Sequence, residues 1–256
     1  MAVYIVGVTG GSGAPYARRL LHALLGMGHN VKLVASASGE KVMEVEEGLR
    51  LHGTVAERER QWKECIALPS DPSLAGPNPL APFPLREGGI DPRPLPFSSP
   101  RSGSRTGPNG EGIAGELELF ANDDVGASIA SGSYPTKAMV IVPCSMGTLG
   151  RIANGVSSSL VERASDVILK ERRQLILVPR ETPLSRIHLR NMLAVTEAGA
   201  EVLPAMPGFY RRPKSVDDLV DFVVGRILDR LGLENALVKR WRGEAREVGL
   251  ADDLMP

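Results

Sequence analysis

The chain has 256 residues, of which 43% are hydrophobic, so it is long enough for one large domain or two small ones with a sizeable core. Its 30 basic and 30 acidic side chains balance and only 4% of its residues are aromatic, which argues against binding to nucleic acid or an anionic membrane. Two cysteines, Cys65 and Cys144, exclude a disulfide framework and a four-thiolate zinc site, and the N-terminus lacks a signal-peptide profile, so we expect a cytoplasmic protein.

The N-terminal region predicts a βαβ unit. Residues 3–8 form a β-branched run that ends at glycines, which is typical of a strand buried on both faces. Pro15 suits the first turn of a helix that ends near Gly26, and a second strand is predicted over 31–35. The apolar residues at helical spacing are Ala17, Leu20, Leu21, Leu24 and Leu25.

The segment 69–108 has a different composition. It contains 11 of the 20 prolines and 5 glycines, with little apolar periodicity. Such a segment buries too little surface to offset its ordering entropy, so we predict a long mobile insertion. It is either a tolerated surface insertion, which we favour, or a lid or partner-binding arm.

The second half of the chain alternates strands and helices. Strands are predicted over 138–142, 174–178 and 201–203, and helices over 160–173, 188–198 and 215–231. The last helix carries one apolar stripe, made of Val216, Leu219, Val220, Val223, Ile227 and Leu228. The alternation predicts a single α/β domain over 1–256 with a doubly wound parallel sheet, flavodoxin-like or Rossmann-like. The last part of this chain, 233–256, is predicted to be a C-terminal tail.

Residues 10–13, Gly-Gly-Ser-Gly, join the first strand to the first helix. Backbone N–H groups and the helix dipole at such a position favour a phosphate, although a tight turn is the alternative. The loop has no Walker lysine, Tyr16 stands where a dinucleotide fingerprint needs a small residue, and the second strand ends in Ser36 rather than an acid. A mononucleotide such as FMN therefore fits better than NAD.

Two further clusters follow predicted strands. Small and hydroxyl residues over 143–149 stand where ligands bind in open parallel sheets. Cys144 in this cluster is either a nucleophile or, as we favour, a buried inert thiol, because no histidine is near it in sequence. Arg180 and Glu181 are either an ordinary ion pair or an anion clamp beside an acid/base.

Two charged patterns have structural interpretations. The predicted helix over 160–173 carries a set of charged residues that we assign to a solvated face, namely Glu162, Arg163, Asp166, Lys170, Glu171, Arg172 and Arg173. The residues 217–221, Asp-Asp-Leu-Val-Asp, match a magnesium-binding motif of prenyl synthases. They follow Ser215 at a helix start, so we assign them to helix capping.

A series of motifs makes the chain resemble the UbiX-type flavin prenyltransferase family. They are TGGSGAPY at 9–16, VASASGEKVMEVE at 34–46, SGSYPTKAMVIVPCSMGTL at 131–149, NGVSSSLVERASDVILKERRQLILVPRETPLSRIHLRNML at 154–193 and PAMPGFYRRPKSVDDLVDFVVGRILDRLG at 204–232. The resemblance implies a flavodoxin-like fold and transfer of a dimethylallyl group from dimethylallyl phosphate to N5 and C6 of reduced FMN. It also implies a homododecamer without metal, whose product, prenylated FMN, serves a UbiD-type decarboxylase.

The resemblance also implies roles for individual residues. The FMN contacts fall on Gly10, Gly11, Ser12, Ser36, Ser145, Met146, Gly147, Thr148 and Arg180. The prenyl phosphate contacts fall on Tyr210, Arg226 and Lys170, the last from a neighbouring subunit, and Trp241 resembles an aromatic residue that covers the prenyl pocket. Glu181 matches the catalytic acid/base and Glu46 a second glutamate of the site. Gly11 replaces the usual alanine, and the insertion is longer than the family pattern.

Two other functions remain as alternatives. One is an FMN-dependent cysteine decarboxylase of the same fold. The other is a non-catalytic flavin carrier subunit, which would have no need of Glu181, Lys170 and Arg226 together.

Overall fold

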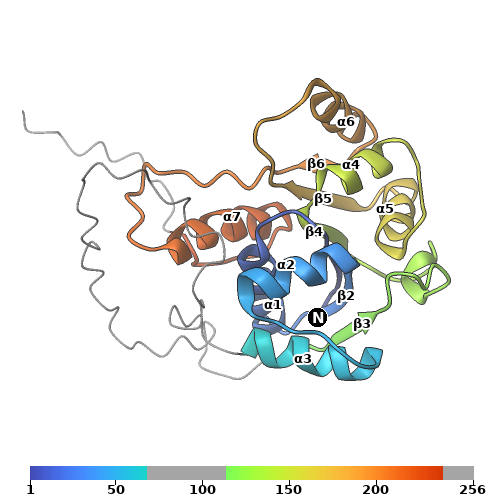
Figure 1. Ribbon diagram of the computed structural model, residues 1–256, viewed down its shortest axis with the longest axis horizontal. Coiled ribbons are helices and arrows are strands. Elements are labelled where there is room, and N and C mark those ends of the chain that lie inside the picture. The colour runs from blue at the N-terminus through green and yellow to red at the C-terminus, as the bar shows by residue number, and fades with distance from the viewer. Residues whose placement is uncertain (68–113, 239–256) are drawn as a thin grey trace, which may run out of the picture.

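The computed structural model describes residues 1–67 and 114–238 (Figure 1). The predicted insertion over 69–108, Trp241 and the tail beyond residue 238 lie outside the described residues.

The described residues contain a sheet of six strands, all parallel, in the order β3-β2-β1-β4-β5-β6. The strands are β1 (Val3–Val8), β2 (Asn30–Ala35), β3 (Leu117–Phe120), β4 (Ala138–Cys144), β5 (Gln174–Pro179) and β6 (Glu201–Val202). Strands β2 and β3 are added on one side of β1, and strands β4, β5 and β6 are added on its other side. The topological switch point of this doubly wound sheet therefore lies between β1 and β4. The predicted fold class is confirmed.

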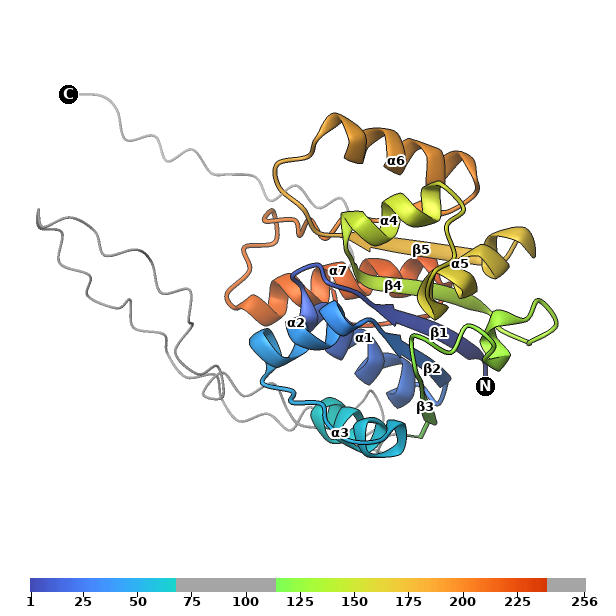
Figure 2. The same cartoon turned by 45° about the vertical axis from the view of Figure 1, so that its right-hand side comes forward.

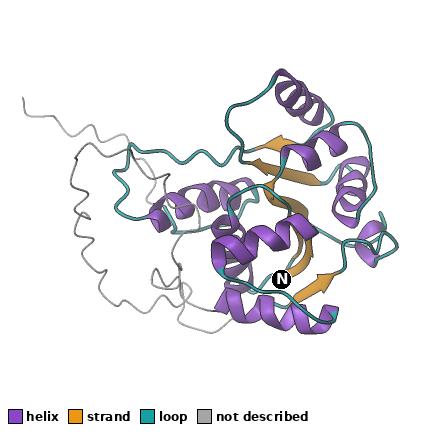
Figure 3. Cartoon of the chain, in the orientation of Figure 1, coloured by secondary structure: helices purple, strands orange, loops and turns teal. Residues whose placement is uncertain are grey.

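Helices cover both faces of this sheet (Figures 2 and 3). They are α1 (Ala14–Gly26), α2 (Ala37–Glu47), α3 (Val55–Ala67), α4 (Met146–Ala153), α5 (Leu160–Lys170), α6 (Arg186–Glu197) and α7 (Val216–Arg230). In Figure 2, α1, α3 and α7 lie on one face, and α4, α5 and α6 lie on the other.

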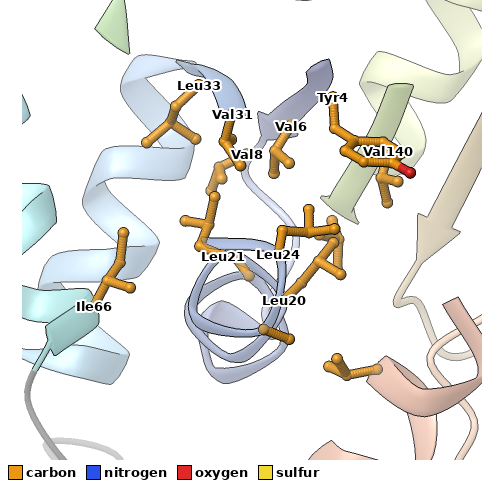
Figure 4. Close-up of a cluster of buried hydrophobic side chains, with 14 of the residues drawn as sticks. Tyr4, Val6, Val8, Leu20, Leu21, Leu24, Val31, Leu33, Ile66 and Val140 are labelled. Atoms are coloured by element: carbon orange, nitrogen blue, oxygen red, sulfur yellow. The ribbon is translucent and has the colours of Figure 1, made fainter. Parts of the chain in front are cut away.

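Alternate residues of the strands feed two separate cores. Val6, Val8 and Leu33 point toward α1, where they pack with Leu20 and Leu24, and all five are fully buried (Figure 4). Each buried leucine contributes about 1.5–3 kcal/mol relative to an exposed one. The opposite face presents a second set to α4, α5 and α6, namely Ile5, Val34, Met139, Ile141, Leu175 and Leu177.

The predicted strands are confirmed to within two residues, but two predictions about helix surfaces are wrong. Val216 is 71% exposed and does not belong to the apolar stripe of α7, because it is the first residue of that helix and lies beyond the edge of the core. Glu162 is only 3% exposed and does not lie on a solvated face. The predicted helix over 160–173 ends at Lys170, because Arg172 takes a left-handed conformation with φ 53.

Candidate active site

The carboxyl ends of β1, β2 and β4 lie side by side. Thr9, which follows β1, forms two hydrogen bonds with residues at the end of β4. The Thr9 hydroxyl donates to the carbonyl of Pro143 at 2.9 Å and accepts from the backbone N–H of Ser145 at 2.8 Å. Thr9 is 1% exposed, so both bonds are shielded from water. The loop after β1 and the turn after β4 are thereby held next to each other at the switch point, where ligands bind in this fold.

Gly10 lets the loop after β1 approach the start of α2. A Cβ atom at Gly10 would lie 2.6 Å from the Cβ of Ser38, which no real side chain tolerates. Ser36, which precedes α2, accepts a hydrogen bond from the N–H of Gly39 at 3.0 Å and caps the helix. Gly10 of the loop after β1 therefore lies against the start of α2, which Ser36 caps, while Gly11 of the same loop faces Pro143 and Cys144.

A carboxylate side chain of α2, that of Glu46, already occupies the N-terminus of α1. Glu46 Oε2 accepts hydrogen bonds from the N–H groups of Gly13 at 2.9 Å and Ala14 at 2.8 Å. A carboxylate at this position is favoured by the helix dipole. These two N–H groups are not available to a phosphate while Glu46 is in place, so the anion-binding part of the loop narrows to residues 10–12.

The turn after β4, residues 145–148, opens helix α4, which the sequence did not reveal. Ser145 Oγ accepts from the N–H of Thr148 at 3.2 Å and donates to Thr148 Oγ1 at 3.0 Å. Arg151, one turn further along, donates to the same Thr148 oxygen at 3.3 Å. Met146 and Gly147 lie in the first turn of this helix, where backbone N–H groups and the dipole favour an anionic or oxygen ligand.

Cys144 lies directly before this turn and is a buried thiol. It is fully enclosed at 0% exposure, and burial raises its pKa to about 12. A thiol with that pKa stays protonated at neutral pH and is a poor nucleophile. The interpretation of Cys144 as a buried core residue is confirmed.

Arg180 and Glu181 follow β5 and do not pair with each other. Arg180 Nε donates to the carbonyl of Ser12 at 3.3 Å, which connects the loop after β5 to the loop after β1. Glu181 Oε1 accepts from the N–H of Thr182 at 3.2 Å. Both side chains are exposed, so the guanidinium and the carboxylate remain accessible to a ligand.

Tyr16 lies beside the candidate site, because a Cβ atom at Gly13 would lie 2.9 Å from its ring, and the sequence alone did not place it there. Burial raises the pKa of its hydroxyl, Arg180 opposes that shift and Glu46 adds to it, so the ring lies within electrostatic reach of both charges. The sequence signal was present, because Tyr16 stands in the first turn of the helix that follows the glycine loop.

A cavity of about 280 Å³ opens beside Glu181, and a second of about 500 Å³ adjoins it. Both are lined by Pro204 and Met206, which form the wall between them. Arg226 lines the second cavity together with Phe222, whose ring meets the ring of Tyr210 edge-on at 6.1 Å. The structure thus places Arg226 on the second cavity and Tyr210 against Phe222 of that cavity, while Arg180 and Glu181 line the adjoining one.

Lys170 does not join the other predicted residues within one chain. It ends α5, just before β5 begins, and therefore lies at the amino edge of the sheet, whereas Arg180 and Glu181 follow the carboxyl edge. Its Nζ pairs with Glu171 at 2.6 Å and its side chain is 50% exposed. Trp241 lies outside the described residues.

The acidic motif over 217–221 caps α7. Ser215 Oγ accepts from the N–H of Asp218, while the Asp218 carboxylate accepts from the N–H groups of Lys214 at 2.7 Å and Ser215 at 3.1 Å. Asp221 is 8% exposed and pairs with Arg19 at 2.6 Å. In the described ranges, no group of three or more His, Cys, Asp or Glu side chains forms a metal-ligand cluster, and no helix is long and apolar enough to cross a bilayer.

The chain is similar to proteins of known family along nearly its whole length. The Flavoprotein family model matches residues 2–228. The flavin prenyltransferase UbiX of Halalkalibacterium halodurans is 41% identical over 245 residues, which cover 96% of this chain and 95% of that protein. The protein of the same name from Pseudomonas aeruginosa is 40% identical over 236 residues, 92% of each chain.

Solved structures agree with these relatives. A crystal structure of AnUbiX in complex with FMN and dimethylallyl pyrophosphate is similar at a TM-score of 0.70 and 31% identity, and the match covers 95% of this chain and 98% of that one. A dodecameric FMN-dependent UbiX-like decarboxylase from Escherichia coli O157:H7 is similar at a TM-score of 0.68 and 34% identity, over 94% of this chain and all of that one. The motifs, the switch-point site and these similarities agree: the chain belongs to the flavoprotein family and, within it, to the UbiX flavin prenyltransferases.

Proposed function

We propose that this chain is a flavin prenyltransferase that moves a dimethylallyl group from dimethylallyl phosphate to reduced FMN. One observation carries the proposal: the Arg180 and Glu181 loop contacts the glycine loop, and the cavity that this loop lines shares Pro204 and Met206 with the cavity lined by Arg226. A flavin site and a site for a small anionic donor are therefore adjacent.

The residues at the strand ends fit FMN. The loop after β1 and the N-termini of α2 and α4 follow neighbouring parallel strands, and Ser36, Ser145 and Thr148 supply hydroxyl groups there. No acid follows β2 to hold the ribose of a dinucleotide, since Ser36 stands at that position. When bound and reduced, FMN supplies the nucleophilic N5 and C6 atoms of the transfer.

The chain's own residues then act on the donor. Loss of the phosphate leaves negative charge on the departing oxygens, and the Arg226 guanidinium and the Tyr210 hydroxyl stabilise that charge. Glu181, whose carboxylate is exposed at the neighbouring cavity, accepts the proton released when the second bond to the flavin closes. Met206 and Phe222 give the prenyl group an apolar surface.

We further propose that the active protein is a homododecamer in which a neighbouring subunit supplies Lys170, and that a UbiD-type decarboxylase receives the product. The E. coli protein described above is dodecameric. Lys170 of one chain lies at the edge of the sheet opposite Glu181, so it reaches a site only across a subunit contact. Helix α6 exposes apolar side chains of the kind that subunit interfaces cover, namely Ile187 at 68%, Leu189 at 53% and Leu193 at 59%.

Mass spectrometry of the flavin tests the function directly. Reduced FMN, dimethylallyl phosphate and the protein are mixed without oxygen, and the extracted flavin is expected to gain one prenyl unit. Recovery of unmodified FMN would support the flavin carrier. Release of carbon dioxide from a cysteinyl substrate would support the cysteine decarboxylase.

Two substitutions separate the assigned roles. Glu181→Gln removes the proton acceptor, so we expect FMN to bind normally while prenyl transfer slows by about 100-fold or more. Arg226→Ala removes a cation from the donor site, so we expect the donor KM to rise by about tenfold or more at unchanged FMN affinity. Titrations with FMN and initial rates measure both quantities, and an equal loss of FMN binding in the two variants would contradict these roles.

A further inference from the structure

The proposed FMN site includes Thr148, whose hydroxyl has a restricted set of hydrogen bonds. A hydroxyl group has one hydrogen to donate and two lone pairs that accept. Thr148 Oγ1 accepts from Ser145 Oγ at 3.0 Å and from Arg151 Nη2 at 3.3 Å, which occupies both lone pairs. Thr148 is 4% exposed, and within the described part of the chain its hydroxyl donates to no other side chain or carbonyl, so its hydrogen has no acceptor there.

Arg151 is held in place by a buried carboxylate. Its Nε pairs with Oε1 of Glu162, and Glu162 is 3% exposed although it carries a charge. The other oxygen of Glu162 accepts from the N–H of Ser158 at 2.8 Å, the hydroxyl of Ser158 at 2.6 Å and the N–H of Ser159 at 3.1 Å. A carboxylate fixed by this many donors has one orientation, and it directs the guanidinium along α4 toward Thr148.

The far side of the guanidinium stays near the ligand-facing turn. A Cβ atom at Gly147 would lie 3.5 Å from Arg151 Nη1, and the Arg151 side chain is 46% exposed. The series therefore runs from the buried Glu162 through Arg151 to the Thr148 hydroxyl, at the turn that opens α4. Glu162 orients Arg151, and Arg151 in turn makes the Thr148 oxygen an acceptor.

We propose that Arg151, oriented by Glu162, is a positioning residue that makes the Thr148 hydroxyl a hydrogen-bond donor to an acceptor oxygen of FMN. The inference rests on the proposed function, because it assigns FMN to this turn. Without Arg151, one lone pair of Thr148 becomes vacant and the hydroxyl is free to rotate, so the donor is no longer directed toward the ligand.

A double-mutant cycle measured by calorimetric titration with FMN tests the inference. We expect Thr148→Val and Arg151→Met each to weaken FMN binding by about tenfold, the size expected for one hydrogen bond of about 1.4 kcal/mol. Because Arg151 acts through Thr148, the double variant should bind FMN as Thr148→Val does. Thr148→Ser, which keeps the hydroxyl, should bind FMN like the unchanged protein.

Further variants separate positioning from folding. Arg151→Met leaves Glu162 buried and unpaired, which lowers stability, whereas Arg151→Met with Glu162→Gln removes the unpaired charge and restores stability. FMN affinity should stay weak in this stable variant, and recovery of affinity together with stability would overturn the proposal. Lys63→Met removes an ion-paired cation of α3, 2.6 Å from Glu59, and should not change FMN affinity.

Two other results overturn the proposal: Arg151→Met binding FMN as tightly as the unchanged protein, or losses at Arg151 and Thr148 that multiply in the double variant. Failure of the proposed function is a different observation. In that case the unchanged protein itself does not bind FMN, or binds it without transferring a prenyl group.

Discussion

Glu46 stands at the junction of two helices, and its contacts define what it does in the folded chain. One of its oxygens serves the N–H groups of both Gly13 and Ala14, so the last turn of α2 caps the first turn of α1. Family resemblance made Glu46 a second glutamate of the catalytic site. These hydrogen bonds support a structural role for Glu46, which holds the end of the glycine loop through the N–H groups of Gly13 and Ala14.

Substitution of Glu46 should lower stability. We expect Glu46→Ala to reduce the free energy of unfolding by about 1–2 kcal/mol, because two helix N–H groups lose their acceptor and the dipole loses its anion. Glu46→Gln, which keeps an oxygen acceptor, should cost less. Urea denaturation measures both, with Glu44→Ala as the control, since Glu44 forms an exposed pair with Lys41. Equal stability of Glu46→Ala and the control would contradict the capping role.

Glu162 should make stability depend on pH. Burial alone raises the pKa of its carboxyl, but hydrogen bonds from Ser158 and the Arg151 guanidinium outweigh burial and hold the pKa below its ordinary value. A carboxyl with a lowered pKa stabilises the folded state fully above its unfolded-state pKa, and this contribution disappears as pH falls through the folded-state pKa. The free energy of unfolding of the unchanged protein should therefore exceed that of Glu162→Gln by about 1–3 kcal/mol at pH 7.

Urea denaturation from pH 7 down to pH 3 measures the difference between these two proteins. The difference should be constant at neutral pH and shrink below about pH 4.3, the usual pKa of an unfolded glutamate. A difference that does not change across this range would show that the Glu162 charge contributes nothing to stability.

At the scale of elements, helix α7 begins with a sequence that matches a magnesium-binding motif but caps the helix. Ser215→Ala removes the acceptor for the N–H of Asp218, so we expect a loss of about 1 kcal/mol in unfolding free energy. Ser157→Ala, at an exposed serine, should lose little. Magnesium or EDTA should change neither the melting temperature nor the rate of prenyl transfer, and a rise in melting temperature with magnesium would contradict the capping assignment.

The predictable elements were those with a strong apolar pattern. Strands β1, β4 and β5 are continuous apolar runs, and α1 repeats buried leucines at helical spacing. Helix α2 buries only Gly39 and Met43, so its sequence has no apolar stripe to reveal it. Helix α4 was missed because its first turn contains Gly147 and Thr148, which are poor helix formers.

The same reasoning explains the success and limits of the site prediction. The segments after β1, β4 and β5 were expected to meet because parallel strands end at one edge, and the Thr9 and Arg180 contacts confirm this. The partners of Glu46 and Glu162 were not predictable. A sequence shows that a helix carries charges, but it does not show which charge faces a neighbouring helix end.

At the scale of the whole molecule, the position of Lys170 predicts that activity requires subunits to associate. At a donor concentration well below KM, mixed assemblies of Lys170→Ala and Arg226→Ala chains should be more active than either variant alone, because some sites combine an intact Arg226 pocket with an intact Lys170 from a neighbour. Assays after co-expression measure the recovery.

The control for this experiment mixes Tyr210→Phe with Arg226→Ala. Both residues adjoin Phe222 of the same chain, so every pocket keeps one defect and the mixture should be no more active than the separate variants. Recovery in the control, or none in the Lys170 mixture, would show that Lys170 does not act across a subunit contact.

The enclosure of Cys144 has a consequence for durability. Reduced flavins react with dioxygen and release peroxide, and peroxide attacks thiolates. Cys144 lies one residue before the turn assigned to FMN, yet it is 0% exposed and its pKa is about 12. An enzyme that works with reduced flavin thereby keeps the thiol at this turn out of reach of the oxidant generated beside it.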